Sequence, residues 1–285
     1  MRKMKIWTLL GIGIGFSLLS LLFTETVPQE NQENVLYSVS QHWKLPSELD
    51  EISGMAWLDG DRIAAVQDEE GIIYIYNLKN KKIDKEIAFG KPGDYEGITT
   101  NKEDAYVLRS DGTIFEISNF EQSTRTVKTF KTPFSDKNNM ETIAIDIQAN
   151  TLLLIPKDRD LESDTYKGIY GFSLRTKKFQ NDPLFKIDLG NPVLKKYREN
   201  NRYKTFRPSD MAMHPKTNEM YILDGAKPKL LILDTNGTIK KIYRLDKKLF
   251  PQPEGITFSP DGRLFISSEA KKNGNGSITE LKLKD

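Results

Sequence analysis

The sequence predicts an all-β protein, a five-bladed β-propeller preceded by one N-terminal transmembrane helix. Three observations lead to this fold class. The chain of 285 residues begins with a long apolar run, continues as many short apolar segments separated by turn residues, and repeats one short phrase at nearly constant spacing. We therefore divide it into a membrane anchor or signal at 1–24, a linker at 25–34 and a propeller domain at 35–285.

The N-terminal run has the length and flanks of a membrane segment. Arg2, Lys3 and Lys5 precede 18 uncharged residues, Ile6–Phe23, which as a helix span about 27 Å, close to the thickness of a bilayer core. Basic residues stay on the cytoplasmic side, so the rest of the chain is expected outside the cell membrane, on its extracytoplasmic face. Thr24–Pro28 is a poor cleavage site, which favours an anchor that stays attached over a cleaved signal peptide.

A repeated phrase predicts the blades. It consists of a polar or acidic residue, a small residue or gap, and an apolar strand, and its five copies are spaced by 43, 45, 69 and 44 residues. Three of these spacings match a blade of four strands. The copies are Ser53–Trp57, Glu96–Thr99, Glu141–Ile145, Asp210–Met213 and Glu254–Phe258.

The fifth repeat contains three strands and then reaches Asp285. We expect Val35–Lys44 to supply its fourth strand, which joins both ends of the chain and removes an open sheet edge. The long spacing of 69 residues contains two insertions, at 158–167 and 191–206. The alternative of six blades is weaker, because residues 195–203 are polar and have helical rather than strand propensity.

Topology predicts which side chains meet. The first strand of a propeller blade lines the central channel, so the five phrases should begin at its mouth, and the ends of the second strands should form a rim there. Converging carboxylates repel unless they share a cation, and hard oxygen ligands select Ca²⁺. The alternative is a set of hydrogen-bonded acids without metal. The predicted metal ligands are Glu96, Glu141, Asp210 and Glu254, and the predicted rim contains Ser53, Asp68, Arg109, Asp158, Asp224 and Glu269.

Composition excludes several other functions. The chain has no Cys, which excludes thiol catalysis and Cys-ligated metals, and 42 basic against 40 acidic residues, which argues against a nucleic-acid partner. His42 and His214 are expected in packing and turn positions, so we assign no catalytic residue. Residues 191–207 carry six basic residues and one acid. They are expected to form a solvated surface, or alternatively a lid or headgroup contact that attracts anions.

The ordered phrases resemble the SdiA-regulated family, the YjiK-like bacterial proteins. The resemblance covers roughly residues 35–285. It implies a five-bladed propeller distantly related to NHL repeats, bound calcium and an N-terminal membrane segment, but it implies no reaction. The segments that carry it are Leu49–Ala56, Asp94–Ile98, Pro208–Pro215 and Pro253–Thr257. The third phrase departs from the pattern, because Thr142 replaces the glycine.

Two functions are compatible with these expectations. The first is a monomeric, membrane-anchored propeller that binds Ca²⁺ and serves as a binding module for an unknown ligand or protein at the channel face. The alternative is a Ca²⁺-dependent hydrolase of the phytase or lactonase type, in which the metal activates water. Propellers host many functions, so fold alone does not decide between them.

Overall fold

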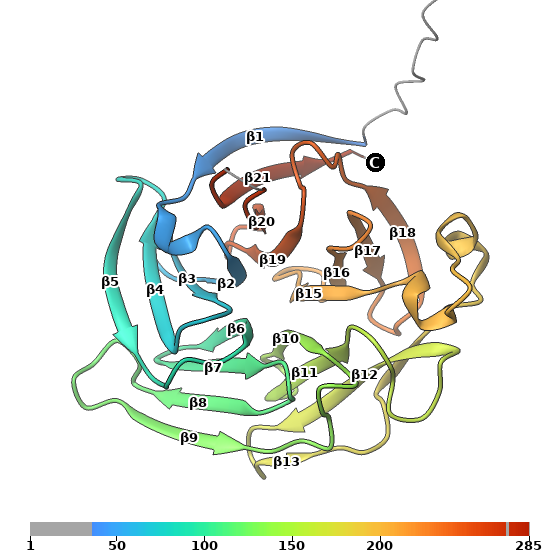
Figure 1. Ribbon diagram of the computed structural model, residues 1–285, viewed down its shortest axis with the longest axis horizontal. Helices are drawn as coiled ribbons and strands as arrows, with labels where there is room; N and C mark the ends of the chain where they lie inside the picture. The colour runs from blue at the N-terminus through green and yellow to red at the C-terminus, as the bar shows by residue number, and fades with distance from the viewer. Residues whose placement is uncertain (1–35, 272–273, 285) are drawn as a thin grey trace, which may run out of the picture. The chain divides into compact units, whose positions relative to one another are not determined.

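Five antiparallel sheets surround a central axis in the computed structural model of the protein, which describes residues 36–271 and 274–284 (Figure 1). Each sheet is one blade. The prediction of a five-bladed propeller is therefore confirmed, and the six-bladed alternative is wrong.

The strands of each blade follow one another from the axis outward. Blade 1 contains β2 (Ile52–Trp57), β3 (Arg62–Gln67), β4 (Ile72–Asn77) and β5 (Lys82–Ala88). Blade 2 contains β6 (Tyr95–Asn101), β7 (Asp104–Arg109), β8 (Ile114–Ser118) and β9 (Thr126–Phe130). Blade 4 contains β15 (Pro208–Met213), β16 (Met220–Asp224), β17 (Lys229–Leu233) and β18 (Ile239–Arg244).

Blade 3 differs in its outer edge. It contains β10 (Met140–Asp146), β11 (Thr151–Pro156) and β12 (Tyr166–Ser173). Two short strands pair with successive parts of β12, namely β14 (Phe185–Asp188) and β13 (Lys178–Phe179). The insertion at 158–167 leads into β12.

Blade 5 joins the two ends of the chain. Its inner strands are β19 (Pro253–Phe258), β20 (Leu264–Ser268) and β21 (Ser277–Leu283), and β1 (Tyr37–Lys44) lies antiparallel to β21. The predicted closure by the N-terminal strand is confirmed. Trp43 Nε1 donates to the carbonyl oxygen of Leu78 at 2.9 Å, and Tyr37 Oη accepts from Asp246 N at 2.9 Å. These two bonds tie β1 to blades 1 and 4.

The hydrophobic core lies between the blades. Five clusters of buried apolar side chains each join two adjacent blades. In β3, Ala64 and Val66 pack toward blade 2, while Ile63 and Ala65 pack toward blade 5. Because both faces of a middle strand are covered, its sequence is an unbroken apolar run rather than an alternating one.

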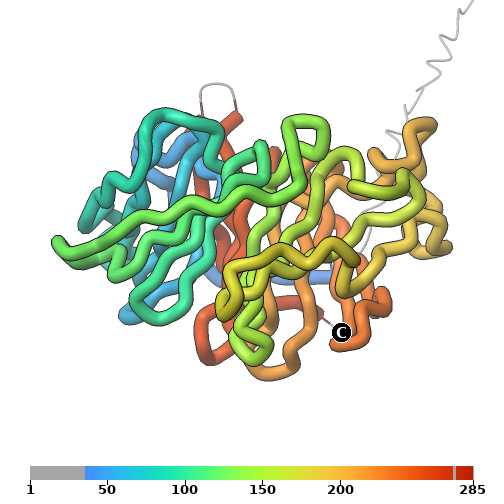
Figure 2. The backbone as a smooth tube through the Cα atoms, turned by 90° about the horizontal axis from the view of Figure 1, so that it is seen from below, coloured from blue at the N-terminus to red at the C-terminus, as the bar shows by residue number. Residues whose placement is uncertain are grey.

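The segment between β14 and β15 forms two short 3₁₀ helices, Pro192–Tyr197 and Arg202–Thr205. Leu194 and Phe206 anchor it in the cluster between blades 3 and 4. Figures 1 and 2 show it at the edge of the disc beside β15 and β18. A third 3₁₀ helix, Ser47–Leu49, connects β1 to blade 1.

The predicted transmembrane helix lies outside the described residues. The described residues from 36 onward form one compact unit. Among residues 36–271 and 274–284, no helix has the length and apolar character needed to cross a membrane.

Candidate metal centre at the channel mouth

The inner strand of every blade contains a β-bulge at the start of the repeated phrase. The register shifts fall at Ser53, Glu96, Glu141 and Glu254 in four blades, and across two residues in blade 4. A bulge bends its strand and turns the extra side chain out of the normal alternation. The phrase in the sequence therefore marks the place where a side chain is turned toward the channel mouth.

A cavity of about 140 Å³ lies at this mouth. Three of the four predicted metal ligands line it, and so do three of the predicted rim residues. The complete lining is Glu51, Ser53, Asp68, Glu96, Glu141, Lys157, Gln252, Glu254 and Glu269.

The glycine that follows the acid in the phrase allows the inner strands to approach closely. A Cβ atom on Gly97 would lie 2.7 Å from the carbonyl oxygen of Glu141. A Cβ atom on Gly54 would lie 2.7 Å from Gly97 Cα. Both distances are too short for any side chain, so glycine at this position keeps the channel narrow and the glutamates close together.

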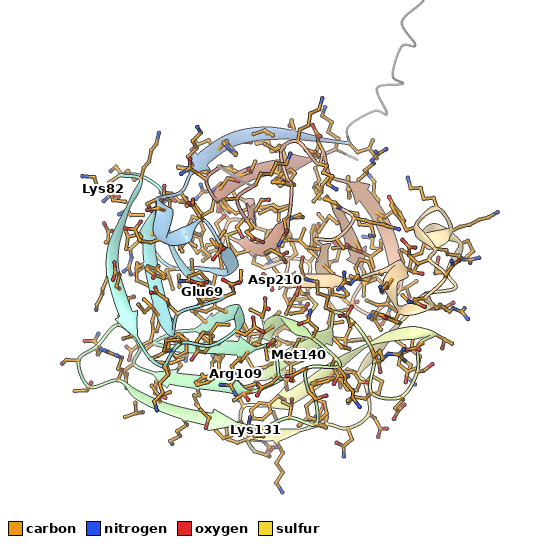
Figure 3. All side chains as sticks on the ribbon, in the orientation of Figure 1. Glu69, Lys82, Arg109, Lys131, Met140 and Asp210 are labelled. Atoms are coloured by element: carbon orange, nitrogen blue, oxygen red, sulfur yellow. The ribbon has the colours of Figure 1, made fainter. Side chains whose placement is uncertain are left out.

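Asp210 occupies a different position from the one predicted. In blade 4 Ser209 stands where the other blades have their anchor, and Asp210 stands at the position of Gly97. Its side chain is fully buried, with Oδ2 accepting from Ile256 N at 2.8 Å and Oδ1 lacking a partner. Burial holds the pKa of Asp210 well above its usual value. Asp210 lies near the axis (Figure 3) but does not line the cavity.

Three of the other predicted rim residues are held in ion pairs outside the cavity. Asp224 is buried against the ammonium of Lys229. Asp158 pairs with Arg207 at 2.9 Å, and Arg109 pairs with a neighbouring aspartate. Of the residues expected at the rim, Ser53, Asp68 and Glu269 line the cavity, together with three residues that the sequence did not point to, Glu51, Gln252 and Lys157.

The one cationic residue among these three is Lys157. The prediction placed Asp158 at the end of the second strand, but Met140 pairs with Pro156, so the next residue, Lys157, reaches the rim. Its ammonium forms an ion pair with Glu141 Oε1. The two side chains are 14% and 5% exposed. Aligning Pro156 with Gln67 of blade 1, the partner of Ile52, would have identified Lys157 as the counterpart of Asp68.

The cavity has a large excess of acidic groups. Six carboxylates and one ammonium line it. Burial, reinforced by the charge of Glu141, raises the pKa of Glu96 to about 9 and that of Glu254 to about 8. Burial also raises the pKa of Glu141 to about 7, although Lys157 opposes the shift. Burial alone would lower the pKa of Lys157, but attraction by Glu141, Glu254 and Glu96 raises it overall.

The oxygen atoms that line the cavity are of the kind that binds a hard cation. As they lie in this structure, however, the side chains do not surround a common point. Within the described parts of the chain, no three acidic or histidine side chains converge closely enough to hold an ion. However, Glu141 Oε2 and Asp68 Oδ1 are buried without a hydrogen-bond partner. Carboxylate and amide carbonyl oxygens are the protein ligands that Ca²⁺ prefers. The residues therefore suit Ca²⁺, provided that their side chains rotate toward a common point.

Neither histidine belongs to the cavity. His42 Nδ1 lies 2.9 Å from Thr279 Oγ1 in blade 5. His214 Nδ1 accepts from Thr217 N at 3.2 Å in a turn, and its ring packs edge-on against Phe258 at 4.9 Å. The expectation that both histidines have structural positions agrees with these contacts.

A second hollow adjoins the first. It has a volume of about 430 Å³ and lies over the junction of blades 2 and 3. Asn139, which lines this groove, donates from Nδ2 to Glu141 Oε1 at 3.2 Å, so the groove and the acidic cavity share a hydrogen bond. Its lining is Gly93, Asp94, Arg109, Ser110, Asp111, Asp136 and Asn139.

Fold and site together define a class, the five-bladed β-propellers with an acidic cavity at one end of the channel. Within that class the chain belongs to the SdiA-regulated family, whose family model matches residues 34–273. The resemblance noted in the repeated phrases is thereby confirmed.

Solved structures share the fold at low sequence identity. The glutaminyl cyclase of Myxococcus xanthus has a TM-score of 0.60 and 12% identity, with 87% of this chain and 96% of that chain covered. A luciferin-regenerating enzyme has a TM-score of 0.53 and 12% identity, with coverage of 85% and 95%. The PQQ-bound aldose sugar dehydrogenase of Streptomyces coelicolor has a TM-score of 0.50 and 12% identity, with coverage of 87% and 98%. A search of curated protein sequences gave no match.

Proposed function

We propose that this protein is a membrane-anchored, extracytoplasmic propeller that binds Ca²⁺ at the channel mouth and presents the ion to a ligand or partner protein. The observation that carries the proposal is the cavity in which six carboxylates face one ammonium. Glu141 adds to it a buried oxygen without a partner. Glu96, Glu141 and Glu254 would hold the ion, with Asp68 and Glu269 at its outer side.

The size of the cavity favours an ion over an organic substrate. Its volume of about 140 Å³ is below the range of roughly 300–1,000 Å³ that is typical of sites for small organic molecules. The adjoining groove of about 430 Å³ lies within that range. We therefore place the ion in the cavity and a larger ligand in the groove. A calcium-dependent hydrolase remains the alternative, but the cavity holds no histidine that could serve as its base.

Calcium titration tests the proposal. Calcium should raise the melting temperature of the metal-stripped chain. At a hundredfold excess over Kd it should increase the free energy of unfolding by about 2.7 kcal/mol, and magnesium should increase it less. Glu141→Gln and Glu254→Gln should lose most of this response. If calcium leaves the melting curve of the wild type unchanged, the cavity is not a calcium site.

Glu116 offers a matched control. Like Glu141 it is buried, pairs with a lysine, and has an Oε2 atom without a partner, but it does not line the cavity. Glu116→Gln should therefore keep the full calcium response. A general loss of response in all three variants would show that the glutamine substitutions act through the fold.

The membrane anchor has its own test. The support for it is the apolar run Ile6–Phe23 with its basic start. Protein recovered from membranes should retain its first 24 or so residues. N-terminal sequencing that finds a mature chain beginning near residue 27 would instead indicate a cleaved signal peptide.

A further inference from the structure

The ammonium of Lys157 lies in the acidic cavity, among the glutamates that we assign to calcium. It pairs with Glu141, and the charges of Glu254 and Glu96 also attract it. Its side chain is 14% exposed. One resident positive charge therefore already interacts with all three glutamates that we assign to calcium.

Hydrogen bonds hold the backbone at Lys157 in place, whereas its side chain reaches the solvent. The ammonium of Lys167, itself fully buried, donates to the carbonyl oxygens of Lys157 and Asp158. Asp158 in turn pairs with Arg207 at 2.9 Å. Lys157 follows directly on β11, and its side chain is already 14% exposed. Rotation about the bonds of this flexible side chain can therefore carry the ammonium toward solvent while the backbone stays in place.

Another buried pair shows which features are specific to the cavity. The ammonium of Lys177 pairs with Glu116, but its side chain is 34% exposed and lies outside the cavity. It also lies 5.8 Å from the ring centroid of Tyr106. Lys177 neutralises one acid, whereas Lys157 is surrounded by several.

We propose that Lys157 is a built-in competitor of the divalent cation. Its ammonium pairs with the carboxylate of Glu141 when no metal is bound and must leave it when Ca²⁺ enters. This inference rests on the proposed calcium site. It implies that Lys157 weakens calcium affinity and stabilises the metal-free protein, since two cations at one point repel and carboxylates without a cation oppose folding.

Affinity measurements on charge variants give the first test. The full chain, solubilised in detergent and stripped of metal, is titrated with CaCl₂ in a calorimeter as wild type, Lys157→Met, Lys157→Gln and Lys177→Met. The two substitutions at Lys157 should tighten calcium binding by about tenfold or more and lower the melting temperature of the metal-free protein. Lys177→Met should leave the affinity unchanged.

Amine labelling of the wild type gives a second test that needs no variant to fold. With acetic anhydride and mass spectrometry, labelling of Lys157 should increase when calcium is added, because the displaced ammonium becomes exposed, while labelling of Lys177 should stay constant. If the wild type binds calcium but either Lys157 labelling does not increase or neither Lys157 variant binds more tightly, the competitor role is overturned and the calcium site stands. If neither the wild type nor any variant binds calcium, the proposed function fails, and the inference fails with it.

Discussion

Ser209 donates a hydrogen bond from its hydroxyl to the carbonyl oxygen of Pro253 at 2.7 Å, across the junction of blades 4 and 5. Ser53 makes the same bond to the carbonyl oxygen of Tyr95, also at 2.7 Å, across the junction of blades 1 and 2. The bulge position in these two blades therefore holds a hydroxyl that fastens the next inner strand. In blades 2, 3 and 5 the same position holds a glutamate.

The two serines should be equivalent in stability experiments. Ser209→Ala and Ser53→Ala should each lower the free energy of unfolding by about 1 kcal/mol, because each leaves a buried carbonyl oxygen with one bond fewer. Chemical denaturation measures the change. Ser47→Ala is the control, since its hydroxyl contacts Glu48 at the exposed surface. A loss at Ser47 as large as that at Ser209 would contradict this interpretation.

Asp210→Asn should change how stability depends on pH. The pKa of Asp210 is raised in the folded state by burial. Between the unfolded pKa near 4 and the higher folded pKa, the folded chain therefore holds a proton that the unfolded chain lacks, and stability falls as pH rises. Glu96, Glu141 and Glu254 contribute with the same sign. Asp210→Asn should remove the contribution of Asp210 to this pH dependence. The free energy of unfolding of the variant, relative to that of the wild type, should therefore increase from pH 4 to pH 8.

Denaturation in chelator across that pH range measures the effect. Asp160→Asn is a matched control, because Asp160 is also buried but both of its oxygens accept bonds, from Gly168 N at 2.6 Å, from Tyr170 Oη at 2.5 Å and from Glu162 N at 3.5 Å. One of these donors would lose its acceptor in the variant, so Asp160→Asn should destabilise the fold by about 1–3 kcal/mol. A destabilisation by Asp210→Asn at pH 8 would mean that Asp210 is ionised in the fold.

The features predictable from the sequence were those that repeat. Five phrases gave five blades, and the missing fourth strand of blade 5 indicated the closure by β1. The acids of blades 2, 3 and 5 were found because each directly begins an apolar inner strand. These signals are local, so neighbouring residues suffice to detect them.

The positions of the other site residues depend on strand register and on ion pairs, and the repeated phrase reveals neither. Blade 4 has an acid at the glycine position, and the shift of one residue became visible only from the bonds of Ser209 and Asp210. Lys157 was missed because the register of β10 against β11, with its bulge, decides which residue reaches the rim. Asp224 was expected at the rim because it ends a second strand. Its ion pair with Lys229, five residues later on the next strand, instead keeps it buried.

Lys229→Met should be strongly destabilising. The ammonium of Lys229 and the carboxylate of Asp224 are 0% and 1% exposed, and removal of one partner leaves a buried charge. The expected loss is about 3–5 kcal/mol. Lys227→Met is the control, because Lys227 pairs with Glu199 at the surface, where both side chains are at least 40% exposed, and it should change stability little. Equal effects in the two variants would show that burial does not govern the Lys229 pair.

The closure by β1 gives the last prediction. A chain that begins at Pro46 lacks β1 and with it Trp43 and Tyr37, which are 6% and 5% exposed and belong to the clusters on either side of blade 5. It also exposes the paired edge of β21 over its whole length, which runs from Ser277 to Leu283. A chain that begins at residue 35 keeps all of these contacts. Because every cluster joins two blades, opening blade 5 weakens the packing on both of its sides. The shorter chain should therefore fail to melt cooperatively by circular dichroism and should be cleaved rapidly in β20 and β21 by protease, whereas the longer chain should resist. If both chains melt at the same temperature, β1 is not required to close the propeller.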